Sequence, residues 1–155
     1  MSELEIRTDD LTGPEVVALL EQHLTEMASH TPICSVHAMD VERLSAPDVT
    51  FWSVWSDGRL AGCGALKEID PTHGEIKSMR TADDFRGQGT GTVILLHLID
   101  VARARGYRRV SLETGSNPPF EPARRLYARH GFVECEPFAD YVHDPWSVFM
   151  TRDLT

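Results

Sequence analysis

The sequence contains no long apolar run and no targeting segment. None of its apolar stretches approaches the roughly 20 residues that a membrane-spanning helix needs. The first five residues, Met1-Ser2-Glu3-Leu4-Glu5, are acidic and lack the basic start and apolar stretch of a signal peptide. We therefore expect a cytoplasmic protein without a membrane partner.

Cysteine is also scarce. The three cysteines, Cys34, Cys63 and Cys135, are odd in number and widely spaced, and no Cys-x-x-Cys pair occurs. This pattern argues against a disulfide framework and against a zinc knuckle, and favours free, buried thiols. The histidines considered as metal ligands are too scattered to form a site by spacing: His23, His30, His37 and His73. We expect no metal.

Positive charge is in deficit. The chain has 15 Lys and Arg against 24 Asp and Glu, a formal net charge of -9. Because nucleic-acid binders are normally basic, we expect no nucleic-acid partner. An acidic surface attracts cations, which is consistent with an amine as substrate, although acidity can serve solubility alone.

What is present is an ordinary globular composition with a clear order of elements. The length of 155 residues predicts one domain spanning 1–155. Asp57-Gly58 predicts a hairpin turn, and Gly62 and Gly64 predict a bend or a close backbone approach. Strands are predicted at 3–8, 50–55, 59–69, 74–81, 109–114, 132–135 and 147–151, and helices at 12–27, 39–44, 93–104 and 122–130. This order favours an α/β (α+β) domain with helices on a mixed sheet.

The central feature is Arg86-Gly87-Gln88-Gly89-Thr90-Gly91, which lies between a predicted strand and a predicted helix. Main-chain N–H groups at a helix N-terminus can bind a diphosphate, and glycines leave room for its approach. The turn is neither a Walker A loop nor a dinucleotide fingerprint, because it lacks Gly-Lys-Ser/Thr and its third glycine comes too early. A tight turn without a ligand is the alternative interpretation.

Two motifs carry a family resemblance. The run Ile76-Lys77-Ser78-Met79-Arg80-Thr81-Ala82-Asp83-Asp84-Phe85-Arg86-Gly87-Gln88-Gly89-Thr90-Gly91 resembles the Arg/Gln-x-x-Gly-x-Gly/Ala signature of the GNAT family of N-acetyltransferases. The run Ala123-Arg124-Arg125-Leu126-Tyr127-Ala128-Arg129-His130-Gly131-Phe132 resembles that family's second signature, at the right distance from the first. The resemblance covers most of the chain from about Thr50 to the end.

The resemblance implies a fold and a co-substrate. The fold is a mixed, mostly antiparallel central sheet of six to seven strands, with helices on both faces and a splayed parallel strand pair. Acetyl-CoA would lie in the split between those two strands, with its pantetheine arm along the first of them and its pyrophosphate on the glycine turn. The expected cofactor-binding residues are Met79, Arg80, Thr81, Arg86, Gly87, Gln88, Gly89, Thr90, Gly91, Thr92 and Asn117. Asn117 stands near the position of a family asparagine, or else only initiates the turn before Pro118.

The resemblance also assigns catalytic roles. Tyr127 matches the tyrosine that protonates the departing thiolate, with a buried core aromatic as the alternative. Glu75, Glu113 and His37 are three candidates for the general base, and the main-chain N–H near Thr81 would polarise the thioester carbonyl. The simpler alternatives are a solvated strand end for Glu75, a structural hydrogen-bonding group for Glu113 and a surface loop residue for His37.

The acceptor is expected near Ser35, His37 and Glu68, at the rim formed by the first helices. The predicted activity is transfer of an acetyl group from acetyl-CoA to a primary amine of a small molecule, amino acid or peptide, by direct attack in a ternary complex. The alternatives are a non-catalytic acyl-CoA-binding regulatory module on the same fold and an unrelated nucleotide-phosphate binder. A homodimer is a further expectation, since small domains of this fold often pair.

Overall fold

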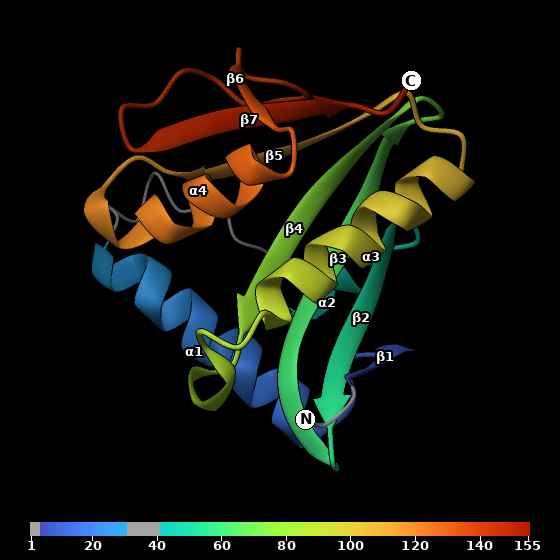
Figure 1. Cartoon of the computed structure of the whole chain (residues 1–155), viewed down its shortest axis with the longest axis vertical. Coiled ribbons are helices and arrows are strands. Elements are labelled where there is room, and N and C mark those ends of the chain that lie inside the picture. Colours follow the sequence, from blue (N-terminus) through green and yellow to red (C-terminus); the bar gives the residue numbers. More distant parts are fainter. Residues whose placement is uncertain (1–3, 31–40) are drawn as a thin grey trace.

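The computed structural model describes residues 4–30 and 41–155 (Figure 1). The predicted order of elements is confirmed, with strands and helices in the expected sequence. Along the chain they are β1 (Glu5–Thr8), α1 (Pro14–His30), α2 (Val41–Leu44), β2 (Val49–Ser56), β3 (Arg59–Asp70), β4 (His73–Thr81), η2 (Asp83–Phe85), α3 (Thr90–Ala104), β5 (Arg109–Gly115), η3 (Pro118–Phe120), α4 (Glu121–Arg129), β6 (Val133–Cys135) and β7 (Ser147–Asp153).

The strands form one seven-stranded sheet in the order β1-β2-β3-β4-β5-β7-β6. Among the strands of residues 4–30 and 41–155, β4 and β5 form the one parallel pair, and every other neighbouring pair is antiparallel. The expectation of a mixed, mostly antiparallel sheet is therefore confirmed. The hairpin between β2 and β3 turns at Asp57 and Gly58, whose φ values of 50° and 76° fit the type I′ turn that the dipeptide favours.

Helices cover both faces of the sheet. On one face α3 contributes Ile94, Leu95, Leu98 and Ile99, each at most 2% exposed, and α4 packs its Tyr127 into the same apolar cluster. A Cβ atom placed on Gly62 of β3 would lie 2.8 Å from the Ile94 Cδ1 atom and 2.6 Å from the Arg80 carbonyl oxygen. The predicted close backbone approach is thus confirmed, and it lets α3 lie tightly on the sheet.

The opposite face is covered by α1, which brings Val16, Leu19 and Leu20 against Phe51 and Cys63. The helix begins at Pro14, a residue favoured in a first turn because its missing N–H needs no acceptor there. Within residues 4–30 and 41–155, no helix has both the length and the apolar character needed to cross a bilayer.

The parallel pair β4–β5 separates along its length. Residues His73–Ile76 of β4 pair with Arg109–Leu112 of β5, and both strands then continue without pairing to one another. Figure 1 shows them diverging from the paired end. Meanwhile β4 stays bonded to β3 as far as Thr81, and β5 stays bonded to β7 as far as Gly115. The expected splayed pair is therefore present.

An extra residue in β4 forms a β-bulge at the split. Ala65 pairs with Lys77 and Cys63 pairs with Arg80, so Ser78 and Met79 together face the single residue Gly64. Ser78 has a φ of 51°, in the left-handed region that few non-glycine residues adopt. The bulge shifts the alternation of side chains, so Lys77 and Arg80 both point to the α1 face.

Candidate active site

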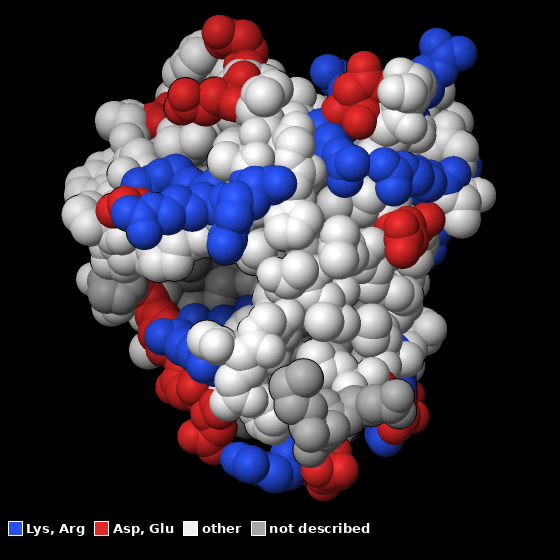
Figure 2. All heavy atoms as spheres, viewed as in Figure 1, with Lys and Arg blue, Asp and Glu red and all other residues white. Residues whose placement is uncertain are grey.

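A cavity of about 740 Å³ lies beside the end of β4, beyond the stretch in which β4 pairs with β5. Its walls come from the end of β4, the glycine turn, the first turn of α3 and the face of α4, with α1 contributing three residues. Figure 2 shows a hollow on this face, with the basic side chains of α4 gathered along one rim. The lining of the cavity changes from the polar glycine turn to an apolar interior. Such a lining suits a ligand with a charged end and an extended arm.

The glycine turn forms the polar end of this cavity. Gly87 and Gly89 have φ values of 75° and 85°, which residues with a side chain rarely adopt. The backbone conformation of the turn therefore explains why both positions are glycine. Gly89 caps α3, and no side chain caps the helix. The N–H groups of Thr90, Gly91 and Thr92 belong to the first turn, where helices have no acceptor of their own. Their dipoles favour an anion at this point.

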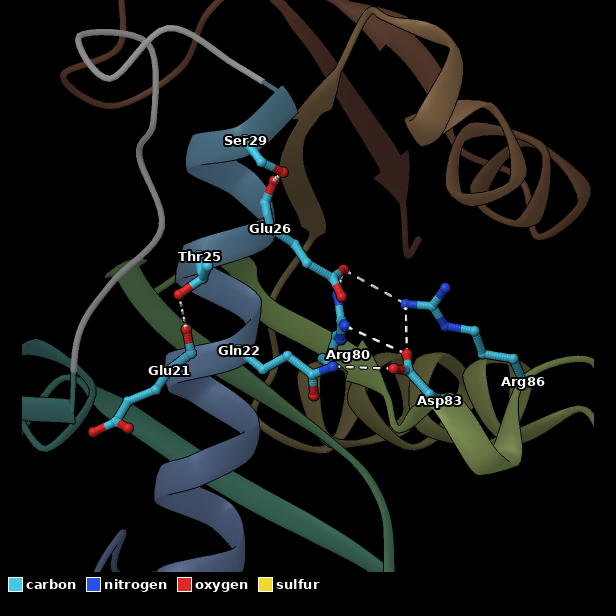
Figure 3. A network of polar contacts seen from close by, with 8 residues as sticks. All are labelled: Glu21, Gln22, Thr25, Glu26, Ser29, Arg80, Asp83 and Arg86. Atoms are coloured by element: carbon cyan, nitrogen blue, oxygen red, sulfur yellow. Dashed lines mark hydrogen bonds and ion pairs between the residues drawn. The ribbon is translucent and has the colours of Figure 1, made fainter.

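Beside the turn, charged residues from three elements form a network (Figure 3). The Arg80 Nη1 atom donates to the Glu26 Oε2 atom at 2.6 Å, and this bond lowers the pKa of the Glu26 carboxyl. The Arg86 Nη2 atom lies 3.0 Å from the Asp83 Oδ1 atom and 3.6 Å from the Glu26 Oε2 atom. Gln22 donates from Nε2 to the Asp83 Oδ2 atom at 3.0 Å. The network ties α1 to β4 and to the turn.

A second cavity of about 120 Å³ lies where β4 and β5 separate. It is lined by Ile76 and Leu112, the last residues of the paired stretch. The two cavities adjoin, because the following residues line both of them: His23, Met27, Met79, Phe120, Ala123 and Tyr127. A ligand arm running along the split would therefore end at the small cavity.

Tyr127 stands at the junction of the cavities. The residue is 7% exposed and belongs to the apolar cluster that α3 forms with the sheet. Its position therefore fits both the catalytic interpretation and the interpretation as a core aromatic. Burial raises the pKa of its hydroxyl to about 12. A phenol with this pKa stays protonated at neutral pH, so its hydroxyl is available as a donor to a group that gains negative charge beside it.

Two carboxylates meet in the small cavity. Glu75 is 3% exposed, and its Oε2 atom accepts hydrogen bonds from the Tyr141 hydroxyl at 2.7 Å and from Lys77 Nζ at 3.1 Å. Lys77 also donates to the Tyr141 oxygen at 2.7 Å. Burial and the charge of Glu75 raise the pKa of Tyr141. Glu113, half-buried, accepts a hydrogen bond from the Ser147 hydroxyl at 2.7 Å. The interpretation of Glu75 as a solvated strand end is therefore wrong.

His23 of α1 faces the same junction. Its Nδ1 atom is buried and has no hydrogen-bond partner among residues 4–30 and 41–155. Burial and the nearby Arg80 charge lower the pKa of His23 to about 4. The imidazole is therefore neutral at pH 7, and its place beside two carboxylates adds no positive charge to the site.

Comparison with known proteins agrees with this arrangement. The family model described as "Acetyltransferase (GNAT) family" matches residues 16–132. The chain belongs to the GNAT family. Over 97% of its length it is 54% identical to the whole of the uncharacterized N-acetyltransferase YsnE of Bacillus subtilis (strain 168). The expected enzyme class, a GNAT-type acyltransferase, is confirmed by these relatives.

Solved structures give the same fold. A crystal structure described as an acyl-CoA N-acyltransferase of Klebsiella pneumoniae superposes with a TM-score of 0.80 at 29% identity, covering 98% of each chain. A GNAT family acetyltransferase of Elizabethkingia anophelis, crystallised with acetyl-CoA bound, superposes with a TM-score of 0.69 at 16% identity, covering 97% of this chain and 98% of that one. At the latter identity the likeness shows the fold alone.

Within the GNAT fold, most residues predicted to bind the cofactor lie together. The large cavity is lined by Met79, Arg80, Thr81, Arg86, Gly87, Gly89, Thr90, Gly91 and Thr92. The Gln88 side-chain Nε2 atom donates a hydrogen bond to the Asp84 carbonyl oxygen at 3.1 Å. Gln88 is not among the described residues that line either cavity. Asn117 is also outside that lining set, and its carbonyl oxygen accepts a hydrogen bond from Arg124 at 3.2 Å.

The predicted acceptor residues fare differently. Glu68 is exposed on β3 and accepts a hydrogen bond at 2.8 Å from the hydroxyl of Tyr107, a member of the α3-side core. The structure therefore does not bring Glu68 to the described lining of either cavity. Ser35 and His37 lie outside the described residues. Sequence reasoning missed Lys77 and Tyr141, and only the alternation of Glu75 with Lys77 on one strand could have indicated the former.

Proposed function

We propose that this GNAT protein transfers the acetyl group of acetyl-CoA to a primary amine of a small molecule, amino acid or peptide. Transfer would occur by direct attack of the amine in a ternary complex. The observation that carries the proposal is the continuity of two cavities: one begins at the glycine turn, the other is lined by Glu75 and Glu113, and Tyr127 lies between them. Such a path joins an anion site to a place for a cationic amine.

The large cavity supports acetyl-CoA as the acetyl donor. The main-chain N–H groups of the glycine turn and of the first turn of α3, from Gly87 to Thr92, would bind the pyrophosphate, with Arg86 adding charge at the mouth. At Met79, Arg80 and Thr81, β4 is no longer paired with β5, so this edge of the strand would offer an extended amide-bearing arm the same bonds that a neighbouring strand would make. The acetyl-CoA complex of the Elizabethkingia relative, which has the same fold, supports this choice of ligand.

The residues around the small cavity support acyl transfer. Glu75 and Glu113 would attract the acceptor as an ammonium ion and take its proton, directly or through water, which frees the nitrogen lone pair. The amine would then attack the thioester carbonyl carbon while the N–H near Thr81 stabilises the developing oxyanion. As the carbon–sulfur bond breaks, the Tyr127 hydroxyl would supply the proton that the thiolate takes. His37 stays a third candidate base.

Two measurements test the proposal together. In a thermal-shift series, acetyl-CoA should raise the melting temperature progressively with concentration, since a ligand that binds only the folded state stabilises it. In a panel of amines, free coenzyme A thiol should appear in proportion to acetylated product. Binding without any amine-dependent thiol release would instead support the non-catalytic acyl-CoA-binding module, and stabilisation by ATP but not coenzyme A would support a nucleotide-phosphate binder.

A cytoplasmic location, a single domain over 1–155 and a homodimer remain part of the proposal. Sedimentation of the purified protein with and without acetyl-CoA tests the homodimer. A single species at the mass of one chain, 17.4 kDa, would exclude it.

A further inference from the structure

Arg80 has more donors in the site than its partners use. Its side chain is only 10% exposed, and one of its nitrogens, Nη1, is bonded to Glu26 (Figure 3). The Nε and Nη2 atoms are buried and have no hydrogen-bond partner in the described part of the chain. The Asp83 Oδ1 atom lies 3.7 Å from Nη2, beyond hydrogen-bond distance.

The two unused nitrogens lie on the same edge of the guanidinium. Nε and Nη2 direct their N–H bonds in parallel, which is the arrangement that binds both oxygens of a carboxylate at once. Buried donors without acceptors are unfavourable, so a protein seldom keeps such an edge unless a ligand completes it. Arg80 lines the large cavity together with His23 and Met27, which also line the small one.

The side chain of Arg80 lies on the α1 face of β4. Because of the bulge at Ser78, Arg80 points to the α1 face, where its partners Glu26 and Cys63 lie. The next residue, Thr81, points to the other face, and its Oγ1 atom would be 3.7 Å from a Cβ placed on Gly91 of the glycine turn. The guanidinium of Arg80 thus lies on the α1 face beside Glu26, whose Oε2 atom is also 3.6 Å from the Arg86 Nη2 atom.

The two cavities differ in charge: carboxylates line the small cavity, and Arg80 lines the large one. Glu75 and Glu113 provide the negative side, and the positive charge of Lys77 is already bonded to Glu75 and Tyr141. His23, neutral at pH 7, lines both the small cavity of this group and the large cavity of Arg80. A ligand that carries an ammonium group at one end and a carboxylate at the other would satisfy both parts.

We propose that the acceptor amine also carries a carboxylate, as an amino acid does, and that the Nε–Nη2 edge of Arg80 binds it. This inference rests on the proposed acetyl transfer and narrows the acceptor class. The main chain of Arg80 would still bond the cofactor arm, while its side chain, which points to the α1 face, would select the acceptor.

The first test compares matched acceptors with the unmodified protein. Free thiol release from acetyl-CoA is measured with α-amino acids, their primary amides and the corresponding decarboxylated amines. The best amino acid should exceed its amide and its decarboxylated form in kcat/KM by on the order of 100-fold, because a buried cation without its partner is costly. Equal rates would overturn the inference and leave acetyl transfer standing, whereas no transfer to any amine would overturn both.

The second test uses Arg80→Lys, which keeps the charge but removes the parallel donors. The preference for carboxylate over amide should fall at least about tenfold, mainly through KM, while the Kd for coenzyme A stays within about twofold of the unmodified value. Arg103→Lys, at an exposed site on α3, is the control and should change neither quantity. A large loss of coenzyme A affinity with an unchanged acceptor preference would mean that the edge binds phosphate, and would overturn the inference.

Discussion

At the scale of single residues, the hydroxyl of Tyr127 is the group whose removal is most informative. It lies at the junction of the cavities with its pKa raised to about 12 by burial, so it is protonated when the thiolate leaves. Tyr127→Phe should lower kcat by about 100-fold and leave the Kd for acetyl-CoA nearly unchanged, as expected for loss of a general acid. Steady-state thiol release and calorimetric titration measure the two quantities.

The matched control is Tyr107→Phe. Tyr107 is also buried, and its hydroxyl donates a hydrogen bond to Glu68. Tyr107 is not among the described residues that line the two cavities. Its kcat should be close to that of the unmodified protein. A full kcat in Tyr127→Phe would show that Tyr127 acts only as a core aromatic.

Glu75 should also contribute to the stability of the folded protein. Its ion pair with Lys77 is buried, with side chains 4% and 8% exposed. Glu75→Gln leaves the ammonium without its counter-charge, which should lower the free energy of unfolding by about 3 kcal/mol. Urea denaturation measures the change, with Glu5→Gln as the control, since Glu5 forms an exposed pair with Arg7 and its loss should not be measurable. Equal urea midpoints for the two variants would contradict the argument.

At the scale of elements, the turn into α3 depends on glycine backbone angles. Gly89 caps α3 with a φ of 85°, although a Cβ there would have open space around it. Gly89→Ala should therefore cost about 1 kcal/mol of stability through backbone strain alone, and any reshaping of the turn should also raise the Kd for acetyl-CoA. Gly13→Ala, before α1, also meets open space but has no positive φ, so it should not be destabilising. Identical melting temperatures for the two variants would exclude the strain.

At the scale of the whole molecule, stability should fall as the pH is lowered from 7. His23 is neutral when folded, with a pKa of about 4 against an ordinary 6.5, so only the unfolded chain takes up its proton between these values. Below that range Glu26, whose pKa is lowered by Arg80, loses its contribution as it is protonated. Between pH 7 and pH 5, the urea midpoint of His23→Gln should drop by less than that of the unmodified protein. The exposed control His143→Gln should show the same drop as the unmodified protein. A flat midpoint over this range would contradict the assignment of His23.

Much of the fold could be predicted because its signals are local. Period-two and helical patterns placed the strands and helices, and Asp57-Gly58 determined a hairpin turn that needs positive φ. The glycine turn was also readable, although α3 starts at Thr90 rather than at residue 93, since the turn residues themselves open the helix. Tyr127 could be predicted to lie at the site because the second motif that resembles the GNAT family includes it.

The remainder depended on contacts between distant segments. Tyr141 reaches Glu75 across 66 residues, from a loop with no motif of its own. Glu68 was expected at the acceptor, but strand alternation directs it to Tyr107 on the other face. The side on which Arg80 lies depends on one extra residue at Ser78, which local propensity does not reveal. The sequence by itself determined the elements, the turn and the family motifs, because backbone angles and periodicity act over a few residues; which polar groups meet in the split was decided by strand register and packing, because these are set by partners far along the chain.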